Sequence, residues 1–546
     1  MKKFSLILLV AVLASLPIFA QQKLAPNVYW IQFTDKNNSP FTIDKPEKFL
    51  SERALERRER YNIPVDMLDI PVNTTYVNGL KNLGLEVLKT SKWLNAALVK
   101  TTDYSLVEKA LELPYVKVYK QWYSGEERIS HNNAVRIDDI QISSVRVADS
   151  TVFNYGNAAN QIKLMNGHYL HNQGFSGQGM VIAVIDAGFT NANTLPAFDS
   201  LWANNQILGT RDFVRGGAIK FNEATHGMQV LSTIGGNIPG RLVGTAPDAH
   251  FWLLRSEDAG SEYPIEEFNW ACAAEFADSV GVDVINSSLG YSEFDETALS
   301  YTYSDMDGET AYSSIAASIA ADKGILVVNS AGNSGDETWK YITSPADAFN
   351  ILTVGGVDAE GDISYFSSFG PTYDKRVKPN VCAKGSSATV QDLYGVSVAD
   401  GTSFSSPIMA GMVTCLWQAF PQFTNVQIIE AVQRSGNKFV NPDPRYGYGI
   451  PDFALAALYL KMAANETLQY DNLNEMLQQV EIAQEEEINV ELFDLTGNCL
   501  YSKKVQTENF SSSLVAYSVL STVEKGMYYM RLSTETTVFQ QPLMKN

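Results

Sequence analysis

Two hydrophobic patterns alternate along residues 151–463. Short apolar runs such as "MVIAVID" and "ILVVNSAGN" are typical of buried strands, whereas "IEEFNWACAAEFADSVG" and "YSSIAASIAADKG" have the apolar spacing of helices. Gly281 and Gly324 end these helical segments, where a helix favours a residue that tolerates a left-handed conformation. Thr424 and Gln427 have the spacing of a capping box at the start of another helix. The alternation predicts an α/β domain, a parallel sheet with helices on both faces.

The flanking regions have different patterns. Residues 21–125 mix strand-like runs ("NVYWIQF", "LEVLKTSKWLNAALVKT", "YVKVYKQ") with helical segments ("EKFLSERALERRERYN", "YSLVEKALEL"), which predicts a small α+β unit. Residues 489–546 alternate with period two in "INVELFDLTGNCLYSKKV" and "GMYYMRLSTETTVFQQPLM", which predicts an all-β sandwich domain. The polar segments 126–150 and 464–488 are expected to be linkers.

Residues 1–20 have the pattern of a secretory signal peptide. Lys2 and Lys3 precede the apolar run "FSLILLVAVLASLPIFA", and Ala20 is a suitable cleavage site. A membrane anchor is the alternative, but the run is short for one. We therefore expect an exported protein, secreted or at the cell surface.

Charge and cysteine content exclude two classes of function. The formal net charge of −20 argues against a nucleic-acid partner, and the basic stretch "RALERRER" is interpreted as a solvated helix face. The four cysteines lie far apart without CxxC spacing, so no zinc site is indicated. An exported protein could form disulfides, but the apolar helical surroundings of Cys272 and Cys415 favour buried free thiols.

Four polar residues stand where predicted strands end or helices begin. Asp186 ends "MVIAVID", His226 begins a helical segment, Asn333 follows "ILVVNSAG", and Ser403 opens "SFSSPIMAGMVTCLWQAF". Because the carboxyl ends of parallel strands meet at one edge of a sheet, we expect these side chains to gather there.

Acyl transfer needs these residue types. A serine hydroxyl becomes nucleophilic when a histidine accepts its proton, and a carboxylate orients that histidine. An asparagine amide together with a backbone N–H can stabilise the oxyanion. Among the clustered serines, Ser403 lies at the strand-to-helix step, whereas Ser405 and Ser406 fall inside the first helical turn before Pro407. Ser403 is therefore the expected nucleophile.

Residues 151–463 resemble the subtilases, the subtilisin-like serine peptidases. The resemblance rests on four motifs in the subtilase order, "VIAVIDAGF", "HGMQV", "SAGNSG" and "GTSFSSPIMAG". It implies that Asp186 orients the histidine, His226 is the general base, Ser403 is the nucleophile, and Asn333 is the oxyanion donor.

The resemblance also implies how substrate binds. Ser288, Leu289 and Gly290 would pair with extended substrate backbone, and Gly332 would line the primary pocket. Two departures lie near the motifs: Ala187 stands where the family usually has Thr or Ser, and "HGMQ" replaces the commoner "HGTH". Both concern supporting residues, so they bear on the rate and not on the mechanism.

Metals are not expected to take part in catalysis. Structural calcium is expected only from the resemblance. The loop "SDMDGET" offers Asp305, Asp307 and Glu309 as oxygen ligands, although a plain turn explains this loop equally well.

The flanking units also have resemblances. The unit at 21–125 resembles the subtilase propeptide, which implies an intramolecular inhibitor with a processing site within 121–150. The tail resembles the C-terminal sorting domains of Bacteroidetes type IX secretion, which implies outer-membrane secretion machinery as a partner. An ordinary carbohydrate- or protein-binding β-sandwich is the alternative.

These observations predict a secreted serine endopeptidase that acts on protein or peptide substrates. A processing or host-directed peptidase of narrow specificity is the alternative with the same fold. A non-catalytic binding protein would have no use for all four chemical residues together. The side-chain specificity, the physiological substrate, and whether the product is released or surface-attached stay open.

Overall fold

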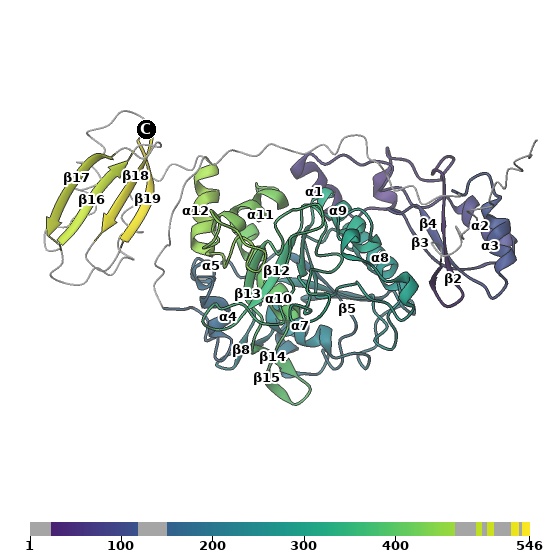
Figure 1. The fold of residues 1–546 in the computed structure, drawn as a ribbon, viewed down its shortest axis with the longest axis horizontal. Helices are drawn as coiled ribbons and strands as arrows, with labels where there is room; N and C mark the ends of the chain where they lie inside the picture. Colours follow the sequence, from purple (N-terminus) through teal and green to yellow (C-terminus); the bar gives the residue numbers. More distant parts are fainter. Residues whose placement is uncertain are drawn as a thin grey trace, which may run out of the picture.

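The computed structural model describes three groups of elements (Figure 1). The described residues are 23–117, 150–464, 487–493, 499–506, 526–533 and 538–545. The predicted signal peptide, the predicted processing site and nearly all of both predicted linkers lie outside these residues.

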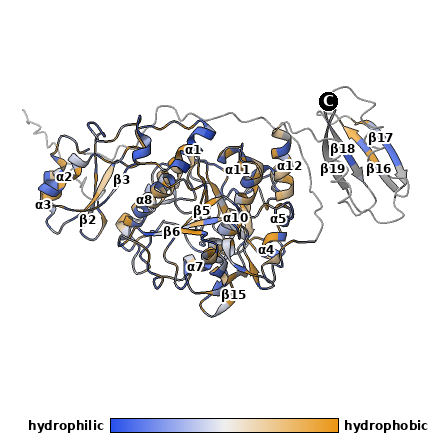
Figure 2. Cartoon of the chain, turned by 180° about the vertical axis from the view of Figure 1, so that it is seen from behind, coloured by the Kyte–Doolittle hydropathy of each residue, from blue (hydrophilic) through white to orange (hydrophobic). Residues whose placement is uncertain are grey.

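A sheet of seven parallel strands forms the centre of the molecule, in the order β13-β12-β11-β10-β5-β9-β6. Its strands are β5 (Val181–Asp186), β6 (Ile207–Asp212), β9 (His250–Arg255), β10 (Val284–Ser287), β11 (Leu326–Ser330), β12 (Leu352–Val357) and β13 (Val381–Lys384). Figure 2 colours β5 as hydrophobic at the centre of this domain.

Helices cover both faces of this sheet. Ile182 and Val184 of β5 pack into one core cluster, and Ala183 and Ile185 pack into the other, because successive strand residues point to opposite faces. The first cluster involves α4 (Ala159–Lys163), α5 (His168–Asn172), α7 (His226–Gly235), α10 (Thr402–Ala419), α11 (Asn425–Arg434) and α12 (Phe453–Ala463). The second involves α8 (Ile265–Ser279) and α9 (Tyr312–Asp322). The predicted α/β architecture is confirmed.

Local signals in the sequence placed the helix boundaries well. Gly281 and Gly324 follow α8 and α9 with φ of +81° and +85°. Thr424 and Gln427 form the expected capping box at the start of α11. Shorter elements complete the domain: η3 (Pro196–Phe198), α6 (Asp199–Ala203), β7 (Asn237–Ile238), β8 (Leu242–Val243), η4 (Thr297–Leu299), η5 (Tyr303–Asp305), β14 (Ala388–Asp392) and β15 (Gly395–Ala399).

The N-terminal unit is a four-stranded antiparallel sheet with helices, as predicted. Its sheet order is β1-β2-β4-β3. The elements are β1 (Lys23–Ala25), β2 (Val28–Gln32), η2 (Pro46–Lys48), α1 (Glu52–Tyr61), α2 (Thr74–Asn82), β3 (Glu86–Ser91), β4 (Ala96–Lys100) and α3 (Tyr104–Leu111). The sequence did not reveal α2, whose "TTYVNGLKN" is poor in strong helix formers. The predicted strand at 115–121 is described only to residue 117, where Val116 bridges Phe33.

One face of this small sheet packs on α8 and α9. The Trp30 ring lies 5.9 Å from Phe268 and 4.5 Å from Tyr312, measured between ring centroids. Trp93 and Leu98 belong to the same buried cluster as the α8 residues. The N-terminal unit thus shares a hydrophobic core with the central domain.

Helix α1 contradicts the interpretation of "RALERRER" as a solvated face. Figure 2 colours α1 as hydrophilic, yet the side chains of Arg57 and Arg58 are only 3% exposed. Arg57 Nη2 donates to Asp278 Oδ1 at 2.6 Å, and Arg58 Nη2 lies 3.0 Å from both carboxylate oxygens of Asp278. The error arose because the periodicity of a charged helix cannot reveal a carboxylate that comes from a distant segment.

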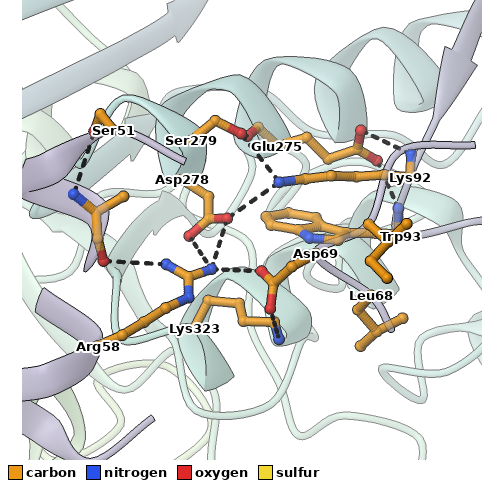
Figure 3. A network of polar contacts seen from close by, with 12 residues as sticks. Ser51, Arg58, Leu68, Asp69, Lys92, Trp93, Glu275, Asp278, Ser279 and Lys323 are labelled. Atoms are coloured by element: carbon orange, nitrogen blue, oxygen red, sulfur yellow. Dashed lines mark hydrogen bonds and ion pairs between the residues drawn. The ribbon is translucent and has the colours of Figure 1, made fainter. Parts of the chain in front are cut away.

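Further charges surround this contact (Figure 3). Arg58 also donates to Asp69 Oδ1 at 2.6 Å, and Lys323 Nζ donates to Asp69 Oδ2 at 3.0 Å. Lys92 Nζ lies 3.3 Å from Asp278 Oδ2. Burial alone would raise the pKa of Asp278, but Lys92, Arg58 and Arg57 hold it well below its usual range. The ionised Asp278 therefore makes its full contribution to the free energy of unfolding above pH 3.8, the ordinary pKa of an aspartate. This contribution is lost only as the pH falls further below that value.

The C-terminal strands form one antiparallel sheet, in the order β17-β16-β18-β19. They are β16 (Glu487–Phe493), β17 (Cys499–Gln506), β18 (Gly526–Ser533) and β19 (Val538–Lys545). Val490, Leu492 and Met530 are buried. The strand-rich character predicted for this region is confirmed.

The four cysteines are free thiols, and Cys272, Cys382 and Cys415 are buried. This agrees with the preference for free thiols over disulfides. Within the part of the chain that the structure describes, no helix is both long and apolar enough to span a membrane.

We predict that Arg58→Met lowers the free energy of unfolding by about 3–5 kcal/mol. The substitution is made in a full-length Ser403→Ala chain, which lacks the expected nucleophile. The reason is that Asp69 and Asp278 would lose a cation while they stay buried. Urea unfolding followed by tryptophan fluorescence measures the change. Arg60→Met is the control on the same helix, because Arg60 is exposed; it should change stability by less than about 0.5 kcal/mol. Equal effects of the two variants would contradict the importance of the buried network.

Candidate active site

The four predicted chemical residues lie at the carboxyl edge of the central sheet. Asp186 is the last residue of β5, and Asn333 follows β11. His226 is the first residue of α7, and Ser403 is the second residue of α10. All four residues therefore lie at or just after a strand end, or at a helix start, as the sequence pattern predicted.

Asp186 and His226 form a hydrogen-bonded pair. His226 Nδ1 lies 2.8 Å from Asp186 Oδ1 and 3.0 Å from Oδ2. The Ala187 N–H also donates to Asp186 Oδ1, at 2.7 Å. Asp186 is fully buried, whereas the His226 side chain is 35% exposed. The carboxylate thus orients Nδ1, which leaves Nε2 for other partners.

Gly227 explains how α7 approaches β5 so closely. A Cβ at this position would lie 2.8 Å from the Asp186 Cβ and 2.6 Å from the Gly188 carbonyl oxygen. Any side chain after His226 would therefore push the histidine away from its carboxylate. The "HG" dipeptide, which is uninformative by itself, has a steric cause here.

Ser403 lies in the first turn of α10, where backbone N–H groups have no acceptor within the helix. The ring of its neighbour Phe404 lies 6.1 Å from the His226 ring, measured between centroids. The Ser403 hydroxyl donates to the Ser288 carbonyl at 3.4 Å, and the Ser288 hydroxyl donates to the Ser403 carbonyl at 2.9 Å. Among the described residues no hydrogen bond joins Ser403 to His226, a contact that often tightens only when substrate is bound.

Asn333 is held by its side-chain oxygen. Oδ1 accepts from the Thr402 N–H at 2.8 Å and from the Thr402 hydroxyl at 2.9 Å. These bonds satisfy an N–H group at the start of α10 and fix the amide. Asn333 is exposed, and its Nδ2 group donates to no described residue. The amide hydrogens therefore remain for a group that binds beside Ser403.

The predicted substrate-binding residues lie beside these groups. Ser288 is buried and Leu289 half-buried, whereas Gly290 is exposed, just after β10. Gly332 is half-buried after β11, and its N–H donates to the Thr402 hydroxyl at 3.2 Å. The segments that follow two adjacent strands thus flank the start of α10.

His226 has a raised pKa. Burial of the ring favours the neutral form, but the charge and hydrogen bond of Asp186 outweigh that effect. The resulting imidazolium is therefore stabilised beside Asp186, which is the property needed in a base that holds a proton during a reaction.

Two further residues near this pair were not found from the sequence. Arg255 is 2% exposed at the end of β9; its Nε donates to the Ala187 carbonyl at 3.1 Å and its Nη1 to Asp212 Oδ2 at 3.0 Å. Arg255 therefore fixes the turn after Asp186, at the position where Ala187 has no hydroxyl group that could support the carboxylate. Glu257 accepts hydrogen bonds from Ser256 and Tyr291, and burial raises its pKa. A charged residue directly after the apolar run "FWLL" was the only signal of Arg255.

The other histidines have different surroundings. His171 is buried between the Tyr155 hydroxyl at 2.6 Å and the Thr245 carbonyl at 3.0 Å, and burial lowers its pKa to about 4. His168 is also buried, and His250 is half-buried. His131 lies outside the described residues. His171 thus has a structural setting.

The acidic loop does not fit a calcium cage. Asp305 Oδ2 accepts from the Thr302 N–H at 2.7 Å, and Asp307 Oδ1 accepts from the N–H groups of Glu309 and Thr310 at 2.8 Å each. The two aspartates therefore cap their own turns. Among the residues that the structure describes, no group of three or more His, Cys, Asp or Glu is placed to hold a metal ion. Structural calcium elsewhere stays a prediction.

Fold and site together define an α/β protein with the residue set of a serine peptidase. The family model described as "Subtilase family" matches residues 177–449, and the chain belongs to that family. A model described as "Peptidase S8 propeptide domain, Bacteroidota" matches residues 28–136, and a "Secretion system C-terminal sorting domain" matches residues 474–546. The protein is a serine endopeptidase with an N-terminal propeptide and a C-terminal sorting domain.

Curated relatives agree with this family. Subtilisin NAT from Bacillus subtilis subsp. natto is 27% identical over 382 residues, which cover 68% of this chain and 84% of the relative. Subtilisin BL from Lederbergia lenta is 29% identical over 284 residues, which cover 51% of this chain and 91% of the relative.

Solved structures are also similar to about half of the chain. "Crystal structure of MycP1 with the N-terminal propeptide removed" matches with a TM-score of 0.41 and 24% identity, and covers 55% of this chain and 96% of that one. "Structure of self-cleaved protease domain of PatA" matches with a TM-score of 0.42 and 22% identity, and covers 53% of this chain and 98% of that one.

We predict that His226 titrates above pH 6.5 in the Ser403→Ala chain, and below pH 6.5 once Asp186→Asn is added. The carboxylate is what raises the pKa, so burial alone should dominate when it is removed. Histidine ring NMR measures both midpoints, and the chain has only five histidines. His171 is the internal reference, because its pKa of about 4 keeps it neutral across the titration. An unchanged His226 midpoint in the Asp186→Asn variant would contradict the assignment of the pair.

Proposed function

We propose that this chain is a secreted endopeptidase that cleaves peptide bonds through an acyl-enzyme on Ser403. His226 accepts the Ser403 proton and later donates it to the leaving amine. Asp186 holds His226 in the productive tautomer and stabilises the imidazolium. The hydrogen-bonded Asp186–His226 pair beside the first turn of α10 is the observation that carries this proposal.

The oxyanion of the tetrahedral intermediate is assigned to two donors. One is the Nδ2 group of Asn333, whose Oδ1 is anchored on Thr402. The other is the Ser403 backbone N–H at the start of α10, which has no acceptor within the helix. Donors that are already oriented stabilise developing charge without reorganisation, so they lower the barrier most.

Substrate is proposed to bind as an extended strand along residues 288–290. Main-chain pairing of this kind recognises the backbone of the substrate and depends little on its side chains. It suits an enzyme that acts on unfolded or flexible protein segments. Gly332 lies opposite, after the adjacent strand β11. The reaction needs no metal in this scheme, because charge stabilisation comes from amide groups.

The propeptide and the sorting domain set the biological context. We propose that the propeptide inhibits the enzyme until it is cut within residues 121–150, and that the signal peptide and the sorting domain export the protein to the cell surface or beyond. The match to a Bacteroidota propeptide and to a secretion sorting domain supports this order of events.

We predict that the purified chain 21–546 loses about its first 100–130 residues over time, whereas its Ser403→Ala variant stays intact. Residues 126–150 have the polar composition of a linker, and polar linkers are preferred sites of proteolytic cuts. Intact-mass measurement follows the loss. The neighbouring Ser405→Ala is the matched control, because the Ser405 hydroxyl donates to the Thr402 carbonyl inside the helix and should not be required.

A serine-reactive phosphonate probe gives a second readout. We expect labelling of Ser403 in the parent and in Ser405→Ala, but none in Ser403→Ala. If the parent stays intact and unlabelled, the propeptide still blocks the site, and the chain is then cut within residues 121–150 with an added protease. Absence of Ser403 labelling after that cut would contradict the proposed chemistry.

We further predict that Asn333→Ala lowers kcat by about 10²–10³-fold with little change in KM, because the lost donor acts mainly on the transition state. Steady-state kinetics on a peptide substrate measure both constants. Asn350→Ala is the control, since Asn350 lies in an exposed turn before β12. A rise in KM with unchanged kcat would assign Asn333 to substrate binding and not to the oxyanion.

A further inference from the structure

Helix α1 of the propeptide contacts the edge of the central sheet that is opposite the candidate active site. Arg53 Nε donates to the Gly281 carbonyl at 2.8 Å, shortly before β10 begins. Arg53 Nη2 donates to the Gly179 carbonyl at 3.0 Å, shortly before β5 begins. Asp186 lies at the other end of β5, a strand of six residues, so the two edges are about 20 Å apart. The contacts of α1 are therefore remote from the chemical residues.

Arg57 places its guanidinium among main-chain carbonyls of the same edge. Its Nε donates to the Lys323 carbonyl at 3.2 Å, and its Nη1 donates to the Val282 carbonyl. These two residues precede β11 and β10. The third nitrogen, Nη2, donates to Asp278 Oδ1 at 2.6 Å. The arrangement uses donors on all three nitrogens of a planar guanidinium, which a lysine could not reproduce.

Two glycines allow α1 to approach this edge closely. A Cβ added to Gly281 would lie 2.7 Å from the Arg53 Cβ and 2.8 Å from the Ala54 nitrogen. A Cβ added to Gly324 would lie 2.6 Å from the Ile63 Cδ1. The glycines that follow α8 and α9 thus also make room for the propeptide.

Tyr61 extends the contact to the end of α10. Its ring stacks on Trp417 with 5.9 Å between the centroids and 26° between the planes. Its hydroxyl donates to the Pro421 carbonyl at 2.9 Å. The surface under α1 is called the α1 seat below, and it consists of residues 179, 278–283, 323–324 and 417–421.

Asp278 shows that the α1 seat fits the charges of the propeptide. It lies in the last turn of α8, which has no basic residue, although a negative charge is unfavourable at the C-terminal end of a helix. Among the described residues, the cations that contact its carboxylate are Arg57, Arg58 and Lys92. All three belong to the propeptide. The binding of the propeptide therefore explains this carboxylate, whereas the catalytic domain alone does not.

We propose that the α1 seat is an arginine-recognition site that holds the propeptide on the enzyme after the linker is cut. Its ligand is a helix with arginines four residues apart, which lie on one face and here are Arg53 and Arg57. The site is separate from the active site, so loss of the α1 contacts becomes a step in the release of the propeptide. The proposal rests on the proposed cut within residues 121–150 and adds a second binding site to the proposed inhibition.

The test uses a full-length Ser403→Ala chain with the recognition sequence of a site-specific protease inserted within residues 121–150. After the cut, size-exclusion chromatography shows whether the propeptide stays bound, and dilution of the complex gives its dissociation rate. The parent should keep the propeptide. Arg57→Met should release it at least about 30-fold faster, because buried carbonyls and a carboxylate lose their donor. Arg60→Met is the control on the same helix, since Arg60 is exposed, and it should behave like the parent.

Arg53→Met tests the same site without a buried side chain of the propeptide. Arg53 is 39% exposed, and its hydrogen bonds to described residues all go to the catalytic domain. The fold of the propeptide therefore does not need this side chain. We expect dissociation about 10-fold faster than in the parent. If Arg53→Met and Arg57→Met both release the propeptide as slowly as Arg60→Met, the α1 seat does not hold it and the inference is wrong.

Phosphonate labelling of the cut chain with Ser403 intact separates this inference from the proposed function. The dissociation rates come from Ser403→Ala chains, so they do not depend on catalysis. If Ser403 is not labelled but the two arginine variants still release the propeptide faster, the proposed chemistry fails and the α1 seat stands. If Ser403 is labelled and the variants match Arg60→Met, only this inference fails.

Discussion

The parallel register of the central sheet is the constraint on which the site depends. Ile185 of β5 lies beside Ser287 of β10, and Ser287 lies beside Asn329 of β11, so the three strands end at nearly one level. Parallel strands need long crossover connections, and here those connections carry α7, α8 and α9. Chemical groups that are far apart in sequence therefore meet at one edge, where helix starts add free N–H groups.

The docking of the propeptide combines two kinds of contact. Trp30 and its neighbours remove apolar surface from water, which supplies most of the favourable free energy. The buried charges around Asp278 contribute differently, because both partners regain water when the units separate. Such a network defines the position of α1 against the ends of α8 and α9 more than it increases affinity.

The site was predictable where local sequence carries the chemistry. Asp186, His226, Asn333 and Ser403 stand next to strand or helix boundaries that apolar periodicity and glycine signals reveal. Arg255 was not predictable, because its importance lies in what it contacts. An arginine after a strand has many ordinary explanations, and only its hydrogen bond to the Ala187 carbonyl distinguishes this one.

By itself, the sequence determined the α/β class, the division into a propeptide, a catalytic domain and a strand-rich tail, and the placement of the four candidate chemical residues at strand ends and helix starts. These features depend on periodicity and short motifs, which are properties of neighbouring residues. Only the tertiary structure decided that the arginines of α1 are buried against Asp278, and that the Thr343 hydroxyl lies against both Gly290 and Gly332. Both are contacts between segments far apart along the chain, and whether a charge is solvated or a pocket is filled depends on the partner that folding brings there.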